Sequence, residues 1–490
     1  MAGAYLASMG IDLDAEMAKV QFSDDKPPAH ELGRPDAKGP PKSKPRAPPP
    51  RYSDVFAPKP ISRITAVRLP GQPASELWDI GIADGRISSI EKHNDRVPRL
   101  SHLPGVMDAS ERLLAPSLCH AHIHLDKCFL LQDPKYSDLE IVDGDFQEAM
   151  NLTSQAKSRF EEDDLLRRGR QLIQESIHHG VTAMRAFVEV DADVEFKCLD
   201  AGLQLKEEFA DKCDVQICAF AQLPLFSGID GGEVIRKLMT AAAKTHGVDV
   251  LGATPYVESD EIKMKMNVRW ISSLALAHNK FLDFHMDYNL EKSKKPFIWD
   301  ALDIIKERCW ANRKGKPITM GHCTRLTYFQ SDDWKKLKES IGDLPVSFVG
   351  LPTSDLFMMR TAENVRGTLN VPKMIQEHGL QAAIAVNNVG NAFTPQGNCD
   401  PLAVASMGVG VYQAATKKDT EILYECVSNR AKEVIGLEAP SFHLKPGDPA
   451  DLVLFDGAGV GWRSRKSVVE AVYDPGNMRT TMKGGRITTN

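Results

Sequence analysis

Short runs rich in Val, Ile, Ala and Phe recur along the middle of the chain, and longer segments with apolar residues at helical spacing lie between them. The runs predict eight strands, over residues 113–124, 181–190, 215–222, 248–257, 281–287, 317–323, 346–351 and 381–388. Helices are predicted between them, for instance over 163–179 and 292–310. Eight strands alternating with helices are typical of the α/β fold known as the (β/α)8 TIM barrel, whose chemistry lies at the carboxyl ends of the strands.

Both ends of this region show another pattern, in which apolar and polar residues alternate over short runs punctuated by turn residues. The runs lie at 64–69, 76–91 and 106–114 before the barrel, and at 448–456, 467–474 and 480–489 after it. All six are expected to be strands. The two ends of the chain should therefore complete one small β domain together.

Residues 27–60 are dense in proline, which removes backbone donors from helices and sheets. We expect a disordered arm here, which is either a solvated tail, a polyproline ligand for a partner domain or a basic targeting patch. The predicted boundaries are 1–58 for the arm, 59–113 and 439–490 for the two parts of the β domain, and 114–438 for the barrel.

The amino-acid composition excludes several classes of function. The 490 residues include 60 Lys or Arg and 66 Asp or Glu, a net charge of −6, with 42% hydrophobic residues. This balance excludes a strongly basic nucleic-acid binder and a mostly disordered chain. The nine cysteines are scattered without a CxxC pair, no apolar run is long enough to span a bilayer, and the start lacks a leader pattern. These features predict a reduced, soluble, cytoplasmic protein that binds neither nucleic acid nor a membrane.

Histidines mark the ends of three predicted strands. His120, His122 and His124 alternate along the first strand, so their side chains are expected to point the same way and to be able to converge on one ion. His285 and His322 close two further strands. A histidine-rich surface edge is the alternative interpretation, but the flanking residues place the run at the end of a barrel strand. A divalent metal held by His122, His124 and His285 is the leading hypothesis.

Several motifs together resemble the amidohydrolase superfamily, and within it the cytosine deaminase-like metal-dependent hydrolases. The motifs are HIHLDK (122–127), MRAFVEVDA (184–192), AFAQ (219–222), GHCT (321–324), NNVGNAFTPQGNCDPL (387–402) and PADLVLFD (449–456). The resemblance spans roughly residue 61 to the C-terminus. It implies a (β/α)8 barrel with a small β-sandwich formed from both chain ends, and a homo-oligomer is the usual state in this family.

The resemblance also implies roles for residues of this chain. His122 and His124 match the metal ligands of the first strand, and His285 matches the ligand of the fifth. His322 matches a histidine that helps to polarise the attacking water or the substrate. The bound ion would be one Zn²⁺ or Fe²⁺.

Further matches concern the substrate. Gln222 matches a glutamine that hydrogen-bonds a heterocyclic amide or amidine, and Asn388 is expected to line the same site. Lys127 lies three residues past the second ligand, where some relatives also have lysine. It either donates to a substrate carbonyl oxygen and assists catalysis, or it only pairs with Asp126.

Three expected acids are replaced in this chain. Asn387 stands where relatives have a metal-binding aspartate, and an amide oxygen can ligate a metal but cannot act as a base. Tyr288 stands in the slot of a proton-shuttling glutamate and is expected to face the substrate, while Asp287 and Glu291 lie nearby but out of register. His120 replaces an acid before the metal motif, and proton transfer would fall to His322, Lys127 and His120.

These observations predict a metal-dependent amidohydrolase that cleaves a C–N bond (an amide, an amidine or an amino group on a heterocycle) of a small, cyclic substrate. The missing acids motivate an alternative, a catalytically inactive relative that binds a ligand or a partner protein. A third hypothesis is a different reaction on the same barrel, such as lactone opening or decarboxylation, because the fold does not determine the chemistry.

Overall fold

The computed structural model describes residues 60–94, 103–308, 310, 316–359, 365–456 and 461–489. The predicted arm, 1–58, lies outside the described residues, and the domain boundaries remain predictions. None of the helices in the described part of the chain is both long and apolar enough to cross a membrane.

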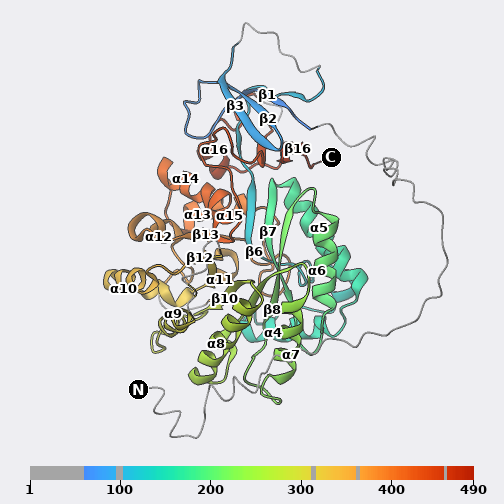
Figure 1. The fold of residues 1–490 in the computed structure, drawn as a ribbon, viewed down its shortest axis with the longest axis vertical. Coiled ribbons are helices and arrows are strands. Elements are labelled where there is room, and N and C mark those ends of the chain that lie inside the picture. Colours follow the sequence, from blue (N-terminus) through green and yellow to red (C-terminus); the bar gives the residue numbers. More distant parts are fainter. Residues whose placement is uncertain are drawn as a thin grey trace, which may run out of the picture. The chain divides into compact units, whose positions relative to one another are not determined.

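Eight parallel strands form the central barrel, and helices surround them (Figure 1). The strands are β6 (Leu118–His124), β7 (Val181–Glu189), β8 (Asp214–Ala221), β9 (Val248–Ala253), β10 (Phe281–Met286), β11 (Ile318–His322), β12 (Val346–Gly350) and β13 (Ala382–Ile384). They pair in chain order. A bridge between Ile123 and Asn387 closes the sheet, with the Asn387 carbonyl accepting from the His124 amide at 2.8 Å. The predicted (β/α)8 barrel is confirmed.

Two predicted strands end earlier than expected. The run at 248–257 is split into β9 and a short 3-10 helix, Pro255–Val257, because proline cannot donate to the neighbouring strand. The run at 381–388 contributes only the three residues of β13 to regular pairing. Beyond β13, the Ala385 amide still donates to Gly350, and the Asn387 amide donates to His122 on β6.

The helices that follow the strands have these bounds: α4 (Phe146–Lys157), α5 (Glu162–His178), α6 (Lys197–Glu208), α7 (Glu233–Lys244), α8 (Glu261–Ala277), α9 (Ile298–Glu307), α10 (Ser331–Ile341), α11 (Pro352–Met358), α12 (Val371–His378), α13 (Pro401–Val411), α14 (Lys417–Glu425) and α15 (Asn429–Val434). The helix predicted at 163–179 is confirmed as α5, with acids in its first turn and His178 in its last, where they complement the helix dipole. The helix predicted at 292–310 is shorter in the structure, where it is α9.

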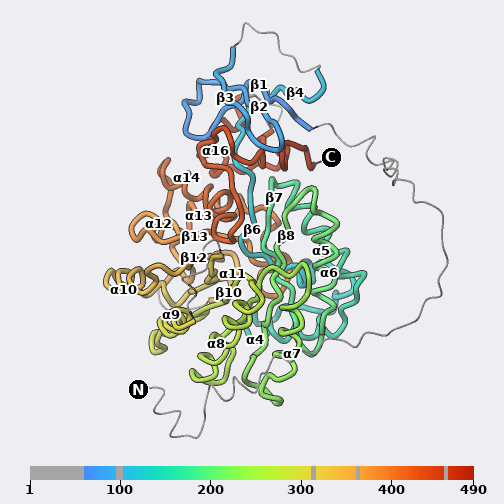
Figure 2. The backbone as a smooth tube through the Cα atoms, in the orientation of Figure 1, coloured from blue at the N-terminus to red at the C-terminus, as the bar shows by residue number. Residues whose placement is uncertain are grey.

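Two four-stranded sheets built from both chain ends make up the small β domain. One contains β1 (Arg63–Val67), β2 (Trp78–Ala83), β3 (Arg86–Lys92) and β4 (Val106–Asp108), and the other contains β5 (Leu114–Pro116), β14 (Leu452–Phe455), β15 (Arg479–Lys483) and β16 (Arg486–Ile487). Side chains from both ends, such as Ile64, Ile80, Leu452 and Met482, share one buried core. The blue strands β1–β4 and the red C-terminal part of the chain accordingly lie side by side in Figure 2.

One expectation about this domain is wrong. Residues 467–474 were expected to be a strand, but they contain the helix α16 (Val468–Tyr473). The Ser467 side chain accepts from the Glu470 amide and so caps the first turn. The alternation of this run fits a strand as well, but the cap favours a helix.

Candidate active site

Three histidines from two strands converge inside the carboxyl end of the barrel. His122, His124 and His285 each offer a ring nitrogen, and these atoms lie within 4.8 Å of one another. The Nε2 atoms of His124 and His285 are 3.2 Å apart. Burial lowers the pKa of all three well below the ordinary value, and neighbouring positive charge lowers it further, so the rings are neutral and keep lone pairs free for a metal.

The polar atoms left without partners also fit a metal. Both ring nitrogens of His122 are buried and have no hydrogen-bond partner among the described residues. Such orphaned groups are costly unless something else satisfies them. The donor set of three imidazoles suits Zn²⁺, Fe²⁺ and similar divalent ions.

Asn387 completes this group of donors. It lies where the barrel closes, with a left-handed backbone at φ 69°. Its Nδ2 donates to Ser354 Oγ at 2.7 Å, while its buried Oδ1 has no hydrogen-bond partner within the described part of the chain. The amide is thus oriented with its acceptor oxygen free, as a metal ligand requires.

His120 does not belong to the site, which corrects the expectation that it faces the metal and shares in proton transfer. A β-bulge between His120 and Ile123 inserts one extra residue into β6 and breaks the alternation of side chains. The ring points instead to α5, where its Nε2 lies 3.0 Å from Ser176 Oγ. Burial lowers the pKa of His120 to about 3, so it stays neutral there.

His322 is held by a carboxylate that the sequence did not reveal. Its Nδ1 donates to Asp355 Oδ1 at 2.7 Å, and Asp355, on α11, also accepts from Thr368 Oγ1 at 2.8 Å. Because a carboxylate only accepts, the proton sits on Nδ1, and Nε2 is left as an acceptor. Burial raises the pKa of Asp355, and the bond to His322 opposes that rise. The segment Pro-Thr-Ser-Asp after a predicted strand was the only available signal for this residue.

A small cavity lies above the histidines. Its volume is about 20 Å³. We call it the catalytic cavity, and it is lined by His124, Lys127, Phe146, Gln222, Tyr256, His285, Tyr288, His322, Asn387, Asn388 and Phe393. The His122 ring lies 4.6 Å from that of His285, between centroids, so the structure brings together all nine residues that the sequence singled out as catalytic, metal-binding or substrate-binding. The Tyr288 ring lies against His322, with centroids 3.9 Å apart.

Lys127 reaches the cavity from a buried ionic network. Its Nζ donates to Glu189 Oε1 at 2.8 Å, so its partner is Glu189, at the end of β7, and the pairing with Asp126 considered from the sequence does not form. Asp126 instead accepts from the Glu189 amide at 2.8 Å. The other oxygen of Glu189 accepts from Lys157 at 2.6 Å. Burial alone would raise the pKa of Glu189, but Lys127 and Lys157 lower it to about 2, so it remains ionised.

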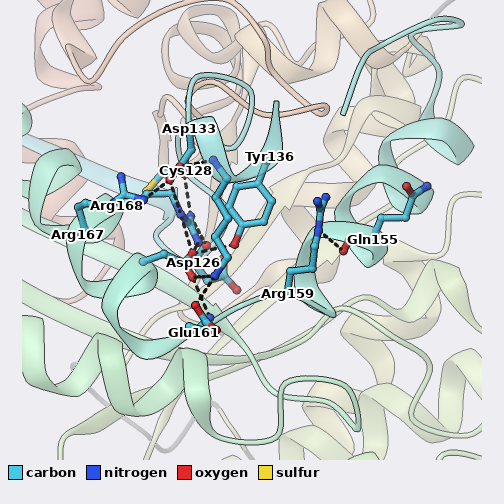
Figure 3. A network of polar contacts seen from close by, with 11 residues as sticks. Asp126, Cys128, Asp133, Tyr136, Gln155, Arg159, Glu161, Arg167 and Arg168 are labelled. Atoms are coloured by element: carbon cyan, nitrogen blue, oxygen red, sulfur yellow. Dashed lines mark hydrogen bonds and ion pairs between the residues drawn. The ribbon is translucent and has the colours of Figure 1, made fainter. Parts of the chain in front are cut away.

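A second network fixes the loop that carries Lys127 (Figure 3). Arg168 on α5 donates to the carbonyl oxygens of Asp126 and Cys128 at 2.7 and 2.8 Å, on either side of Lys127. Its guanidinium also pairs with Asp164 at 2.9 Å. The backbone around Lys127 is therefore anchored to a helix rather than left to a free loop.

The nearby acids Asp287 and Glu291 do not replace the missing glutamate. Asp287 accepts from the amides of Phe297 and Ile298 at 2.8 and 2.9 Å, and thereby caps the start of α9. Glu291 is exposed and pairs with Lys294. Both side chains therefore make their polar contacts outside the catalytic cavity.

The fold and the site together define a class of protein, a (β/α)8 barrel with a histidine cluster at its catalytic end and a β domain built from both chain ends. The chain is 24% identical, over 84% of its length and 93% of the relative, to N-isopropylammelide isopropyl amidohydrolase of Pseudomonas sp. (strain ADP). No family model matches it. These findings agree with the resemblance to the amidohydrolase superfamily that the sequence motifs indicate.

Two solved structures show the same fold. The 5-methylcytosine deaminase from Klebsiella pneumoniae aligns with a TM-score of 0.74 at 23% identity, covering 87% of this chain and 97% of that one. The N-isopropylammelide isopropylaminohydrolase from Burkholderia multivorans aligns with a TM-score of 0.68 at 22% identity, with the same coverage.

Proposed function

We propose that the protein is a metal-dependent hydrolase that cleaves a C–N bond in a small, cyclic substrate, such as an amide, an amidine or an amino group on a heterocycle. The observation that carries this proposal is the convergence of His122, His124 and His285 at the end of the barrel where catalysis takes place in this fold. Each of these rings has a buried nitrogen atom without a hydrogen-bond partner among the residues that the structure describes. The names of similar proteins, a deaminase and an amidohydrolase, support it.

The three histidines and Asn387 Oδ1 would hold one Zn²⁺ or Fe²⁺. When bound, such an ion polarises the scissile carbon and lowers the pKa of water toward neutrality. The remaining steps need groups that move protons and orient the substrate.

His322 is the proton-transfer group of this proposal. Asp355 keeps the proton on Nδ1, so Nε2 can accept a proton at the cavity and later return it to the leaving nitrogen. Lys127 uses one of its three N–H donors on Glu189, and its other donors are directed to a substrate oxygen. A positive charge there stabilises negative charge that develops on this oxygen.

Three further residues orient the substrate. Gln222 and Asn388 offer amide groups at the cavity surface, and Tyr288 offers an aromatic face beside His322. Amides and an aromatic ring suit a flat, polar heterocycle, because they combine hydrogen bonds at its edge with stacking on its face.

The inactive alternative rested on the missing acids. The Asp355–His322 pair supplies a base held by a carboxylate at the same cavity, so Asn387 and Tyr288 are compatible with activity. We also propose that the protein acts in the cytoplasm, on a small molecule, as a homo-oligomer.

Metal content and hydrolysis test the proposal. Protein purified without a histidine tag and reconstituted with Zn²⁺ or Fe²⁺ should hold about one equivalent of metal, and should hydrolyse a member of a panel of cyclic amides, ureas and amino-heterocycles. His124→Asn should lose the metal. His120→Asn is the matched control, because that histidine lies on the same strand but faces α5, and it should retain the metal. Less than about a tenth of an equivalent in the parent protein would reject the proposal.

A further inference from the structure

A second cavity lies beside the catalytic cavity. A cavity of about 30 Å³, which we call the adjoining cavity, has a lining of three kinds of side chain: apolar (Met150, Leu223, Phe393), neutral polar (Thr153, Ser154, Gln222) and charged (Lys157, Glu189, Asp193). Gln222 and Phe393 also line the catalytic cavity, so these two side chains form the partition between the two spaces.

One face of α4 builds the outer wall. Phe146, Met150, Thr153 and Lys157 follow one another at helical spacing, which places them on the same side of the helix. Phe146 lines the catalytic cavity, whereas the other three line the adjoining cavity. A single helix face thus runs past both spaces.

Thr153 gives the adjoining cavity a vacant hydrogen-bonding position. This residue is 6% exposed, and its Oγ1 is buried with no hydrogen-bond partner among the described residues. Lys157, by contrast, is already paired with Glu189 and Asp191. A buried hydroxyl without a partner is costly, so its position calls for a group that satisfies it.

We propose that the adjoining cavity is a second subsite, which takes a short, mainly aliphatic substituent of the substrate with one polar atom hydrogen-bonded to Thr153 Oγ1. This inference rests on the proposed hydrolase function. Met150, Leu223 and Phe393 supply an apolar wall for the aliphatic part. Because Gln222 and Phe393 line both cavities, a substrate bound in the catalytic cavity would present such a substituent to the adjoining cavity past these two side chains.

A binding measurement that needs no turnover tests the subsite. Metal-loaded protein carrying ¹³C-methyl methionine is titrated with 2-propanol, an aliphatic probe with one hydroxyl group. The methyl resonance of Met150, assigned with Met150→Leu, should shift and saturate. Met239, which is buried elsewhere on α7, should not respond.

Three variants make the result specific. Leu223→Trp fills the cavity and should abolish the saturable shift, whereas Leu356→Trp, at an exposed leucine on α11, should leave it unchanged. Thr153→Val keeps the shape and should weaken binding about 5-fold, because it removes one hydrogen bond. A shift that fails to saturate, that persists in Leu223→Trp or that is unaffected by Thr153→Val would overturn the subsite.

The two proposals fail separately. An absent or unspecific shift at Met150 in a protein that holds metal and hydrolyses a panel compound rejects the subsite alone. A specific, saturable shift in a protein that holds no metal retains the cavity as a binding site and rejects the hydrolase.

Discussion

Asp355 offers the sharpest test of how the site moves protons. The change Asp355→Asn removes the carboxylate behind His322 while keeping nearly the same shape. In the parent, that carboxylate accepts the His322 Nδ1 proton at 2.7 Å and is fully buried. Hydrogen bonds to charged groups contribute about 1.5–3 kcal/mol, against about 0.5–1.5 kcal/mol for neutral pairs. The substitution therefore weakens the bond by about 1–1.5 kcal/mol.

This difference sets the expected loss of rate. Since about 1.4 kcal/mol corresponds to a factor of ten, kcat should fall about 10-fold if the imidazole keeps its tautomer. If the new amide instead turns its NH₂ group to Nδ1, the proton moves to Nε2 and the base is lost, a change that costs on the order of 10⁴ in serine proteases. KM and bound metal should stay close to the parent values, because Asp355 touches neither the metal site nor the cavity.

Steady-state kinetics on the panel compound that the parent hydrolyses, with metal analysis of each variant, measure these effects. Thr368→Val is the control, because it removes a different donor to Asp355, at 2.8 Å, and leaves the His322 bond in place. An equal loss of kcat in Thr368→Val would show that only packing matters around the carboxylate. An unchanged kcat in Asp355→Asn would refute the role of the pair.

Three other changes probe the metal and the buried charges. Asn387→Asp places an unpaired carboxylate beside the histidines, so it should lower the free energy of unfolding of the metal-free protein by about 1–3 kcal/mol. Adding Zn²⁺ should restore the stability. Calorimetry that shows equal stability of variant and parent without metal would contradict this prediction. Chelation should destabilise the parent, by about 4 kcal/mol relative to metal at 1,000-fold above its Kd, and an unchanged Tm would contradict a folded-state site. Glu189→Gln should cost about 3–5 kcal/mol at neutral pH, measured by urea unfolding, because it leaves Lys127 and Lys157 without their shared partner. Lys127 and Lys157 lower the Glu189 pKa from 4.5 to about 2 against the effect of burial. The difference in unfolding free energy between parent and variant should therefore shrink as the pH falls from 4.5 to about 2. A difference that does not depend on pH would contradict the pairing.

The sequence was sufficient to predict the barrel and most of the site because both depend on strong local signals. Buried parallel strands appear as continuous apolar runs, and residues that follow such runs gather at one end of the barrel. His285 and His322 therefore came together with His122 although about 160 and 200 residues separate them along the chain.

The errors have equally local causes. A β-bulge leaves no composition signal, so the inserted residue that turns His120 away from the metal could not be anticipated. A short amphipathic run such as 467–474 fits both periods, and only its Ser467 cap settles the helix. Asp355 and the α4 residue Thr153 belong to no motif. The role of Asp355 depends on its contact with His322, which lies 33 residues away along the chain.

The placement of the acids changes how the replaced positions are understood. Among the described residues that line the catalytic cavity there is no Asp or Glu, yet Glu189 and Asp355 each contact a side chain that does line it. These two carboxylates thus lie outside the lining of the catalytic cavity, where they contact Lys127 and His322. A cavity surface that carries an ammonium group, metal-binding imidazoles and neutral amides favours a transition state that gathers negative charge on oxygen. In the proposed mechanism, proton transfer passes through His322, which Asp355 holds, and no carboxylate has to line the catalytic cavity.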